Sequence, residues 1–108
     1  MIYLASPYYH AVEGIMEGRY QSALKFCAES ARQGINIYSP IVHWHPVAKA
    51  HDLPRGHKFW RQLNHEMIKL SDEVWILRIP GRAESAGVAD ELAYAESLHR
   101  RVRLVYEP

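Results

Sequence analysis

Apolar residues along the chain fall alternately into short runs and longer periodic stretches. Each short run is closed by turn-forming residues, which is typical of buried strands. The longer stretches repeat apolar residues every three or four positions, as in a helix that buries one side. The predicted strands are Ile2–Ala5, Ile35–Tyr38, Glu73–Ile79 and Val102–Val105, and the predicted helices are Val12–Gln33, Lys58–Leu70 and Ser85 to about His99.

Strands separated by helices pair in parallel through right-handed crossovers. The pattern therefore predicts one domain over residues 1–108, a small doubly wound α/β fold of the Rossmann or flavodoxin type. The strand order 2-1-3-4 places the carboxyl ends of the first and third strands side by side. Residues 3–8 then lie beside residues 85–91, at the edge where open α/β sheets bind ligands.

The segment Ile41–Gly56 has no clear period and contains two prolines and three of the seven histidines. We expect a loop here, and a loop of this length in a small domain is usually functional or mobile.

Composition excludes several classes of function. The 108 residues carry a net charge of +1, which gives no electrostatic reason to expect a nucleic acid polymer or a membrane surface as partner. The one cysteine, Cys27, fits a reducing compartment. No apolar run approaches the roughly 18 residues of a membrane span. Met1 leads directly into a strand-like run, with no leader-like segment before it, so a cytoplasmic location is expected.

The most informative residue is Glu91. On a helical wheel it falls inside the apolar stripe formed by Val88, Leu92, Ala95 and Leu98, whereas Asp90 points to solvent. A carboxylate on a buried stripe is costly unless it is needed there. Either Glu91 reaches solvent or pairs with an arginine, or it lines a cleft as a catalytic carboxylate, and we favour the cleft.

Residues near Glu91 fit a ligand site. Ser85 is a plausible helix N-cap, and Gly87 lacks a side chain, so a ligand could approach the amides at the helix start. Arg19 lies in the half of its helix nearest the carboxyl edge of the predicted sheet. Either a surface salt bridge or a contact with the ligand would explain it equally well.

Histidines and aromatic residues offer further candidates. His43 and His45 alternate in His43-Trp44-His45-Pro46, but no third ligand at a recognised spacing follows, so we expect no metal. Both are instead candidates for substrate contact, with polar loop residues as the alternative. Tyr3, Tyr8 and Tyr9 could stack on a flat base. No G-x-S-x-G or G-x-G-x-x-G motif is present, so neither a serine nucleophile nor a dinucleotide cofactor is predicted.

Three blocks resemble the nucleoside 2-deoxyribosyltransferase-like superfamily, in particular a small bacterial and phage branch of it. The blocks are Ile2-Tyr3-Leu4-Ala5-Ser6-Pro7-Tyr8, Tyr38-Ser39-Pro40-Ile41 with His43, and Pro80-Gly81 followed by Ser85-x-Gly87-Val88-x-x-Glu91. The resemblance covers nearly the whole chain. It implies N-glycosidic chemistry in which Glu91 attacks the anomeric carbon of a sugar and Tyr3 orients the carboxylate.

The resemblance also implies roles for other residues. Ser6, Ser85 and Gly87 would bind a 5′-phosphate or the sugar, with Pro7 and Tyr8 in the same loop. Ser85 stands where transferases of free nucleosides carry an aspartate, and monophosphate hydrolases also have serine there. Those hydrolases have a serine and an arginine where this chain has Pro7 and Tyr9, so Arg19 or a neighbouring subunit would have to replace that phosphate contact.

A further departure concerns the leaving base. The superfamily commonly has an acidic residue near Trp60, and this chain offers Gly56, His57 and Asn64, with Asp52 upstream.

The sequence thus supports two functions. The first is an enzyme that cleaves or transfers the N-glycosidic bond of a nucleoside 5′-monophosphate or nucleoside, and the second is a nucleotide-sensing module without catalysis. A histidine–metal hydrolase is a weaker third. A homodimer or larger homo-oligomer is expected, because a second subunit readily completes a shallow cleft on so small a domain.

Overall fold

Four strands form a single parallel sheet in the order β2-β1-β3-β4, as predicted. The computed structural model describes residues 1–107. The strands are β1 (Ile2–Ala5), β2 (Ile37–Tyr38), β3 (Glu73–Leu77) and β4 (Arg101–Val105), and the helices are α1 (Glu13–Arg32), α2 (Pro40–His51), α3 (His57–Lys69) and α4 (Ala86–Ser97). The fold is therefore α/β and Rossmann-like.

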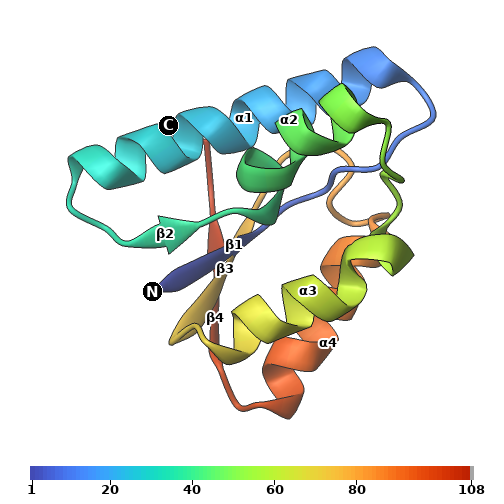
Figure 1. Cartoon of the computed structure of the whole chain (residues 1–108). Helices are drawn as coiled ribbons and strands as arrows, with labels where there is room; N and C mark the ends of the chain where they lie inside the picture. The colour runs from blue at the N-terminus through green and yellow to red at the C-terminus, as the bar shows by residue number, and fades with distance from the viewer. Residues whose placement is uncertain (108) are drawn as a thin grey trace.

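Helices cover both faces of the sheet (Figure 1). Side chains alternate between the faces along β1, since successive residues of a strand point in opposite directions. Tyr3 and Ala5 enter the core beneath α3 and α4, whereas Leu4 joins Leu77 in the core beneath α1. The alternation thus assigns Tyr3 to the face that α4 covers.

The central position of β1 brings the candidate residues together. Tyr3 is paired with Val74 and Ala5 with Ile76, so β1 and β3 end at the same edge of the sheet. The loop after β1 and the start of α4 both leave from this edge, as the order 2-1-3-4 predicts.

The predicted loop over residues 41–56 is wrong, because most of it is helix α2. Ser39 caps this helix by accepting a hydrogen bond from the Val42 amide at 3.2 Å, and Pro40 occupies the first turn, where proline is tolerated. The buried positions of the helix include Ile41, His45 and Ala48. The helical period was hidden because the middle member of this stripe is a histidine and Pro46 follows it.

The remaining element boundaries shift by a few residues at most. Strand β2 begins at Ile37 rather than Ile35, and β3 ends at Leu77 rather than Ile79. Gly34 follows α1 with a φ of +77°, a left-handed conformation that favours glycine at a helix end. No helix within residues 1–107 has both the length and the apolar character needed to cross a membrane.

Candidate functional site

A cleft of about 260 Å³ opens at the carboxyl edge of the sheet, bordered by α2, α3 and the start of α4. Its lining includes Ser6, Tyr8, His45, Ser85, Gly87 and Glu91, all of which the sequence placed at the site. A concave site of this kind, with a few polar groups among aromatic side chains, is typical of small-molecule binding.

Glu91 lines the cleft and forms a buried pair with Tyr3, which does not itself line it. Glu91 lies on α4 with 6% of its surface exposed, and Tyr3 is fully buried beneath it. The Tyr3 hydroxyl donates a hydrogen bond to Oε2 of Glu91. Glu91 therefore neither reaches solvent nor forms an ion pair within the described residues, and the prediction that it lies on the buried stripe of the helix is confirmed.

Burial shifts the protonation of this pair. Desolvation raises the pKa of Glu91 to about 8, the hydrogen bond from Tyr3 acts in the opposite direction, and the charge of Asp90 raises it further. The pKa of Tyr3 is also raised, by its burial and then by Glu91. A carboxyl group that changes charge near neutral pH inside a cleft is typical of functional sites.

Hydrogen-bond donors line the start of α4. Ser85 is the N-cap, as predicted, and its hydroxyl accepts from the Val88 amide at 3.1 Å. The amides of Ala86 and Gly87 have no acceptor within residues 1–107. The Ser6 hydroxyl is also buried without a partner in the same part of the chain. These groups suit an anion or sugar hydroxyls, and the positive end of the helix dipole adds to the attraction for an anion.

The position of Gly87 has a second structural reason. A Cβ atom at this residue would come within 3.2 Å of the Cβ of His57 at the start of α3. Part of the space that the sequence analysis reserved for a ligand is thus used for the close approach of α3 and α4.

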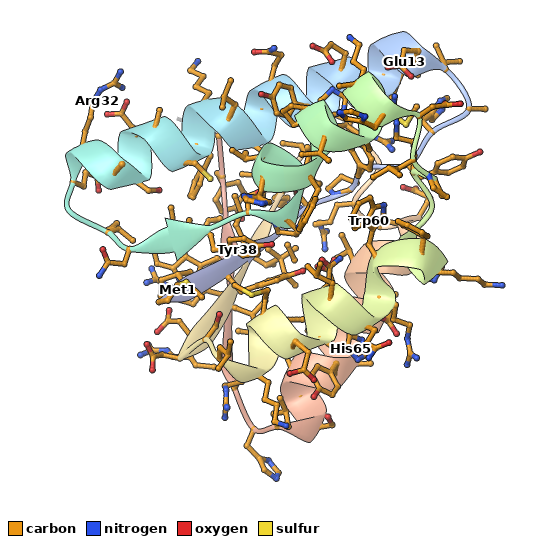
Figure 2. The ribbon with its side chains drawn as sticks, in the orientation of Figure 1. Met1, Glu13, Arg32, Tyr38, Trp60 and His65 are labelled. Carbon is orange, nitrogen blue, oxygen red and sulfur yellow. The ribbon has the colours of Figure 1, made fainter. Side chains whose placement is uncertain are left out.

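Aromatic residues form another part of the wall. The rings of Trp44 and Trp60 lie 5.2 Å apart at 35°. Trp60 lies near the start of α3 (Figure 2), and its indole N–H donates to the Pro54 carbonyl at 2.8 Å. Beside them, the Asn64 Oδ1 is buried without a hydrogen-bond partner among the described residues. Trp44 was missed because it lay in the supposed loop, and Trp60 because its period assigned it to the core.

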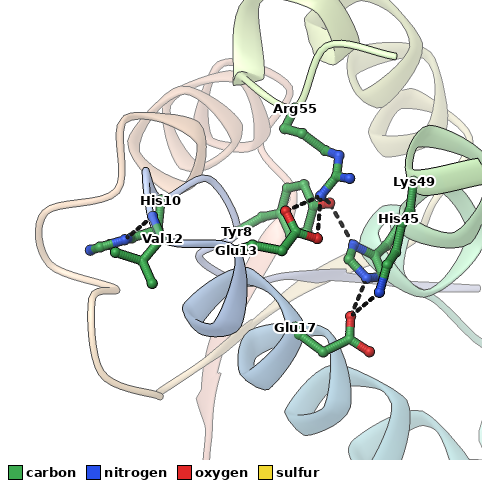
Figure 3. Close-up of polar contacts among 8 residues, drawn as sticks. All are labelled: Tyr8, His10, Val12, Glu13, Glu17, His45, Lys49 and Arg55. Atoms are coloured by element: carbon green, nitrogen blue, oxygen red, sulfur yellow. Dashed lines mark hydrogen bonds and ion pairs between the residues drawn. The ribbon is translucent and has the colours of Figure 1, made fainter. Parts of the chain in front are cut away.

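A chain of polar contacts runs from α1 to the cleft (Figure 3). His45, only 3% exposed, lies 2.6 Å through Nε2 from Oε2 of Glu17 and 2.6 Å through Nδ1 from the Tyr8 hydroxyl. Arg55 donates to the same hydroxyl at 3.3 Å and pairs with Glu13 at 3.2 Å. His45 was predicted at the site, whereas Glu17, Glu13 and Arg55 were not, since nothing in their spacing links them.

Four predicted site residues do not line the cleft, and one of them, Tyr3, is buried against Glu91. Arg19 donates to the backbone carbonyls of Tyr9 at 3.0 Å and Tyr8 at 3.4 Å, and its guanidinium occupies the space where a side chain at Gly81 would lie. It braces the loop after β1 instead of pairing with a surface carboxylate or facing the cleft. His43 is exposed, with its ring 4.6 Å from that of Trp44, and Pro7 is fully buried.

The prediction that Asp90 points to solvent is also wrong. Asp90 lines the cleft and binds Arg61 at 2.8 Å and His65 at 2.7 Å. Burial acts to raise its pKa, but the hydrogen bonds from Arg61 and His65 hold that pKa below its usual value. Asp90 is therefore an ionised, paired carboxylate.

The histidines of α2 do not form a metal centre with their neighbours. Both ring nitrogens of His45 are hydrogen-bonded to protein groups. The ring of His43 instead lies beside that of Tyr38, with 6.3 Å between the ring centroids. Within residues 1–107, no three histidine, cysteine or acidic side chains lie close enough together to hold a metal ion.

Comparison with known proteins identifies the family to which the chain belongs. No curated protein matches the chain. Residues 1–107 match the family described as a domain of unknown function, DUF1937. Because this match covers nearly the whole sequence, the chain belongs to the DUF1937 family.

Proposed function

We propose that this protein cleaves or transfers the N-glycosidic bond of a nucleoside 5′-monophosphate or nucleoside. The observation that carries the proposal is Glu91, which lines the cleft next to the N-terminus of α4 and is hydrogen-bonded to the buried Tyr3. The resemblance of Ser85-x-Gly87-Val88-x-x-Glu91 to the nucleoside 2-deoxyribosyltransferase-like superfamily supports the same assignment.

Glu91 is suited to the chemistry at the sugar. When ionised, a buried carboxylate stabilises an oxocarbenium-like transition state and can form a glycosyl ester with the anomeric carbon. Water or a second base then resolves the ester. Tyr3 holds one carboxyl oxygen through its hydrogen bond, so the other oxygen is left to face the substrate.

The other groups of the cleft would bind the two ends of a nucleotide, its phosphate and sugar at one end and its base at the other. The free amides of Ala86 and Gly87 and the Ser6 hydroxyl would bind the 5′-phosphate or the sugar hydroxyls. Trp44 and Trp60 would contact the flat face of the base, and Asn64 offers its side-chain amide to the edge.

A second function, a nucleotide-sensing module, is favoured by the same carboxyl group. With a pKa of about 8, Glu91 is largely protonated in the unliganded protein at neutral pH. A protonated carboxyl group is a good hydrogen-bond partner for a bound sugar but a poor nucleophile. The two functions therefore differ in turnover and not in the ligand.

Free-base release distinguishes them. Purified protein is incubated with a panel of nucleosides and 5′-monophosphates, and released base is measured by chromatography. We expect release from one substrate class, abolished by Glu91→Gln and unchanged by Glu96→Gln, a matched change at an exposed position of the same helix. Ligand binding without release from any member of the panel would support the sensing module instead.

A further inference from the structure

We propose that Tyr8 is the acid that protonates the leaving base, and that His45 and Glu17 are positioning residues that deliver the proton to it. The inference rests on the proposed function. It starts from the contacts of Figure 3, in which these three side chains form one line from the surface of α1 to the cleft.

The cleft needs a proton donor that can regain its proton from solvent, and among the lining groups Tyr8 has contacts that form such a path. A nucleobase is a poor leaving group unless it accepts a proton as its bond to the sugar breaks. Asp90 is ionised and bound by Arg61 and His65, and Asn64 carries no acidic proton. Glu91 is assigned to the sugar. Tyr8 lines the cleft and its hydroxyl is connected to an imidazole.

The carboxylate of Glu17 fixes the orientation of His45. An ionised carboxylate can only accept hydrogen bonds, so Nε2 must carry its hydrogen. The hydrogen bond to His45 is also the first cause of the lowered pKa of Glu17, which keeps Glu17 ionised. In the neutral imidazole, Nδ1 is then an acceptor and the Tyr8 hydroxyl donates to it.

Protonation of His45 reverses that last contact. Nδ1–H then donates to the Tyr8 oxygen, and the phenolic hydrogen is free to point into the cleft. Arg55, which donates to the same oxygen at 3.3 Å, favours negative charge developing there. Burial raises the pKa of Tyr8 while Arg55 acts to lower it, so the phenol is protonated at neutral pH.

The surroundings of His45 fit a proton path. Glu17 and Tyr20 face the His45 ring from α1, and Tyr8 contacts it from the loop after β1. Lys49 lies on α2, the helix that carries His45, and its Nζ is 3.8 Å from the Glu17 carboxylate. The imidazole itself is buried, whereas 38% of the Glu17 side chain is exposed. Protons can therefore reach His45 from solvent on the side away from the substrate.

Cleavage of the N-glycosidic bond forms one bond at the sugar and breaks another. An oxygen of ionised Glu91 forms a bond to the anomeric carbon, and the carbon–nitrogen bond breaks with its electron pair on the base. The base takes the phenolic proton of Tyr8, and the Tyr8 oxygen takes the Nδ1 proton of the imidazolium. His45 is left neutral and regains a proton from water.

The test is the dependence of kcat on the acidity of the leaving base. The substrate that the wild type cleaves is compared with analogues whose bases carry ring halogens and leave more readily. We expect Tyr8→Phe to lower kcat by about 100-fold or more on the parent substrate, with a loss that shrinks as the base becomes more acidic. Tyr106→Phe, which removes an exposed hydroxyl outside the cleft, should change nothing.

Glu17→Gln is the second variant, since it alters a partly exposed side chain and keeps a hydrogen-bond acceptor for His45. It should show the same dependence with a smaller loss. A loss by one uniform factor across the series, or no loss, would overturn the assignment of Tyr8 while leaving Glu91 as the nucleophile. No base release from any substrate by the wild type would overturn the proposed function and this inference together.

Discussion

Glu91 is a glutamate whose burial keeps it protonated at a pH where exposed glutamates are ionised. If it acts as a nucleophile, the free protein is active only in its ionised fraction. We predict that kcat/KM rises with pH, with a midpoint near the pKa of about 8, because this parameter reports groups of the free enzyme. A pH–rate profile of base release measures it, and a profile without a rising limb near this pH would contradict the role of Glu91.

Tyr3 lowers the pH of that midpoint, against the larger effect of burial. Its hydrogen bond lowers the pKa of Glu91, so Tyr3→Phe should move the rising limb of the profile to higher pH and reduce the plateau. A limb that stays in place would show that Tyr3 does not act on the carboxyl group.

The same pKa has a consequence for stability. The pKa of Glu91 is higher in the folded chain than in the unfolded chain, so its protonated form favours folding. That contribution is complete below the unfolded value and is lost as the pH rises toward about 8. We predict a decline in the free energy of unfolding on the order of a few kcal/mol over this range.

Urea denaturation at several pH values measures that decline. Glu91→Gln should flatten it, because glutamine does not titrate and can still accept the Tyr3 hydrogen bond. An equal slope in the wild type and the variant would contradict the raised pKa.

The residues at the site differ in how readily the sequence reveals them. Glu91 and Ser85 were predictable because one lies on an apolar stripe and the other precedes a helix start. Arg19 was misplaced because a helical wheel gives a direction but not the carbonyls of Tyr8 and Tyr9 that the guanidinium meets. Glu17, His45 and Tyr8 come from three segments, and only the folded chain brings them together.

At the scale of elements, the start of α4 depends on its cap. Ser85→Ala removes the acceptor for the Val88 amide and should lower the free energy of unfolding by about 1 kcal/mol. Ser22→Ala, within α1, is the control and should not destabilise the protein, because alanine is the better helix former. Equal stability of Ser85→Ala and the wild type in urea denaturation would show that the cap contributes little.

Helix α2 shows where the pattern of apolar residues fails. Its buried stripe passes through His45, a polar residue in the sequence whose two ring nitrogens are both hydrogen-bonded in the structure. In the strands and the other helices, enough apolar side chains share the buried face for the period to be visible, although α1 also buries Ser30 and α4 also buries Glu91.

At the scale of the whole molecule, the strand order followed from the alternation of strands and helices together with the handedness of crossovers. What the sequence could not give is the outline of the cleft, because its wall combines α2 with α3 and α4. Large apolar side chains remain exposed at this edge. Tyr9, which lines the cleft, is 60% exposed, and Phe59, which packs on Trp60 at 4.7 Å, is 53% exposed.

Such residues at the mouth of a cleft fit a second subunit that completes it. We predict a homodimer or a larger homo-oligomer in solution. Light scattering coupled to size-exclusion chromatography measures the mass, and a monomer at micromolar concentration would contradict this expectation.

If Glu91 attacks the sugar, a glycosyl ester forms on its side chain and can be trapped. A substrate that the protein cleaves is prepared with fluorine at the 2′ position, which slows resolution of the ester, and the protein is analysed by intact mass and peptide mapping. We predict a mass increase of one fluorinated sugar unit on Glu91, absent in Glu91→Gln. Release of base with no adduct at any residue, or an adduct on a residue other than Glu91, would show that Glu91 is not the nucleophile.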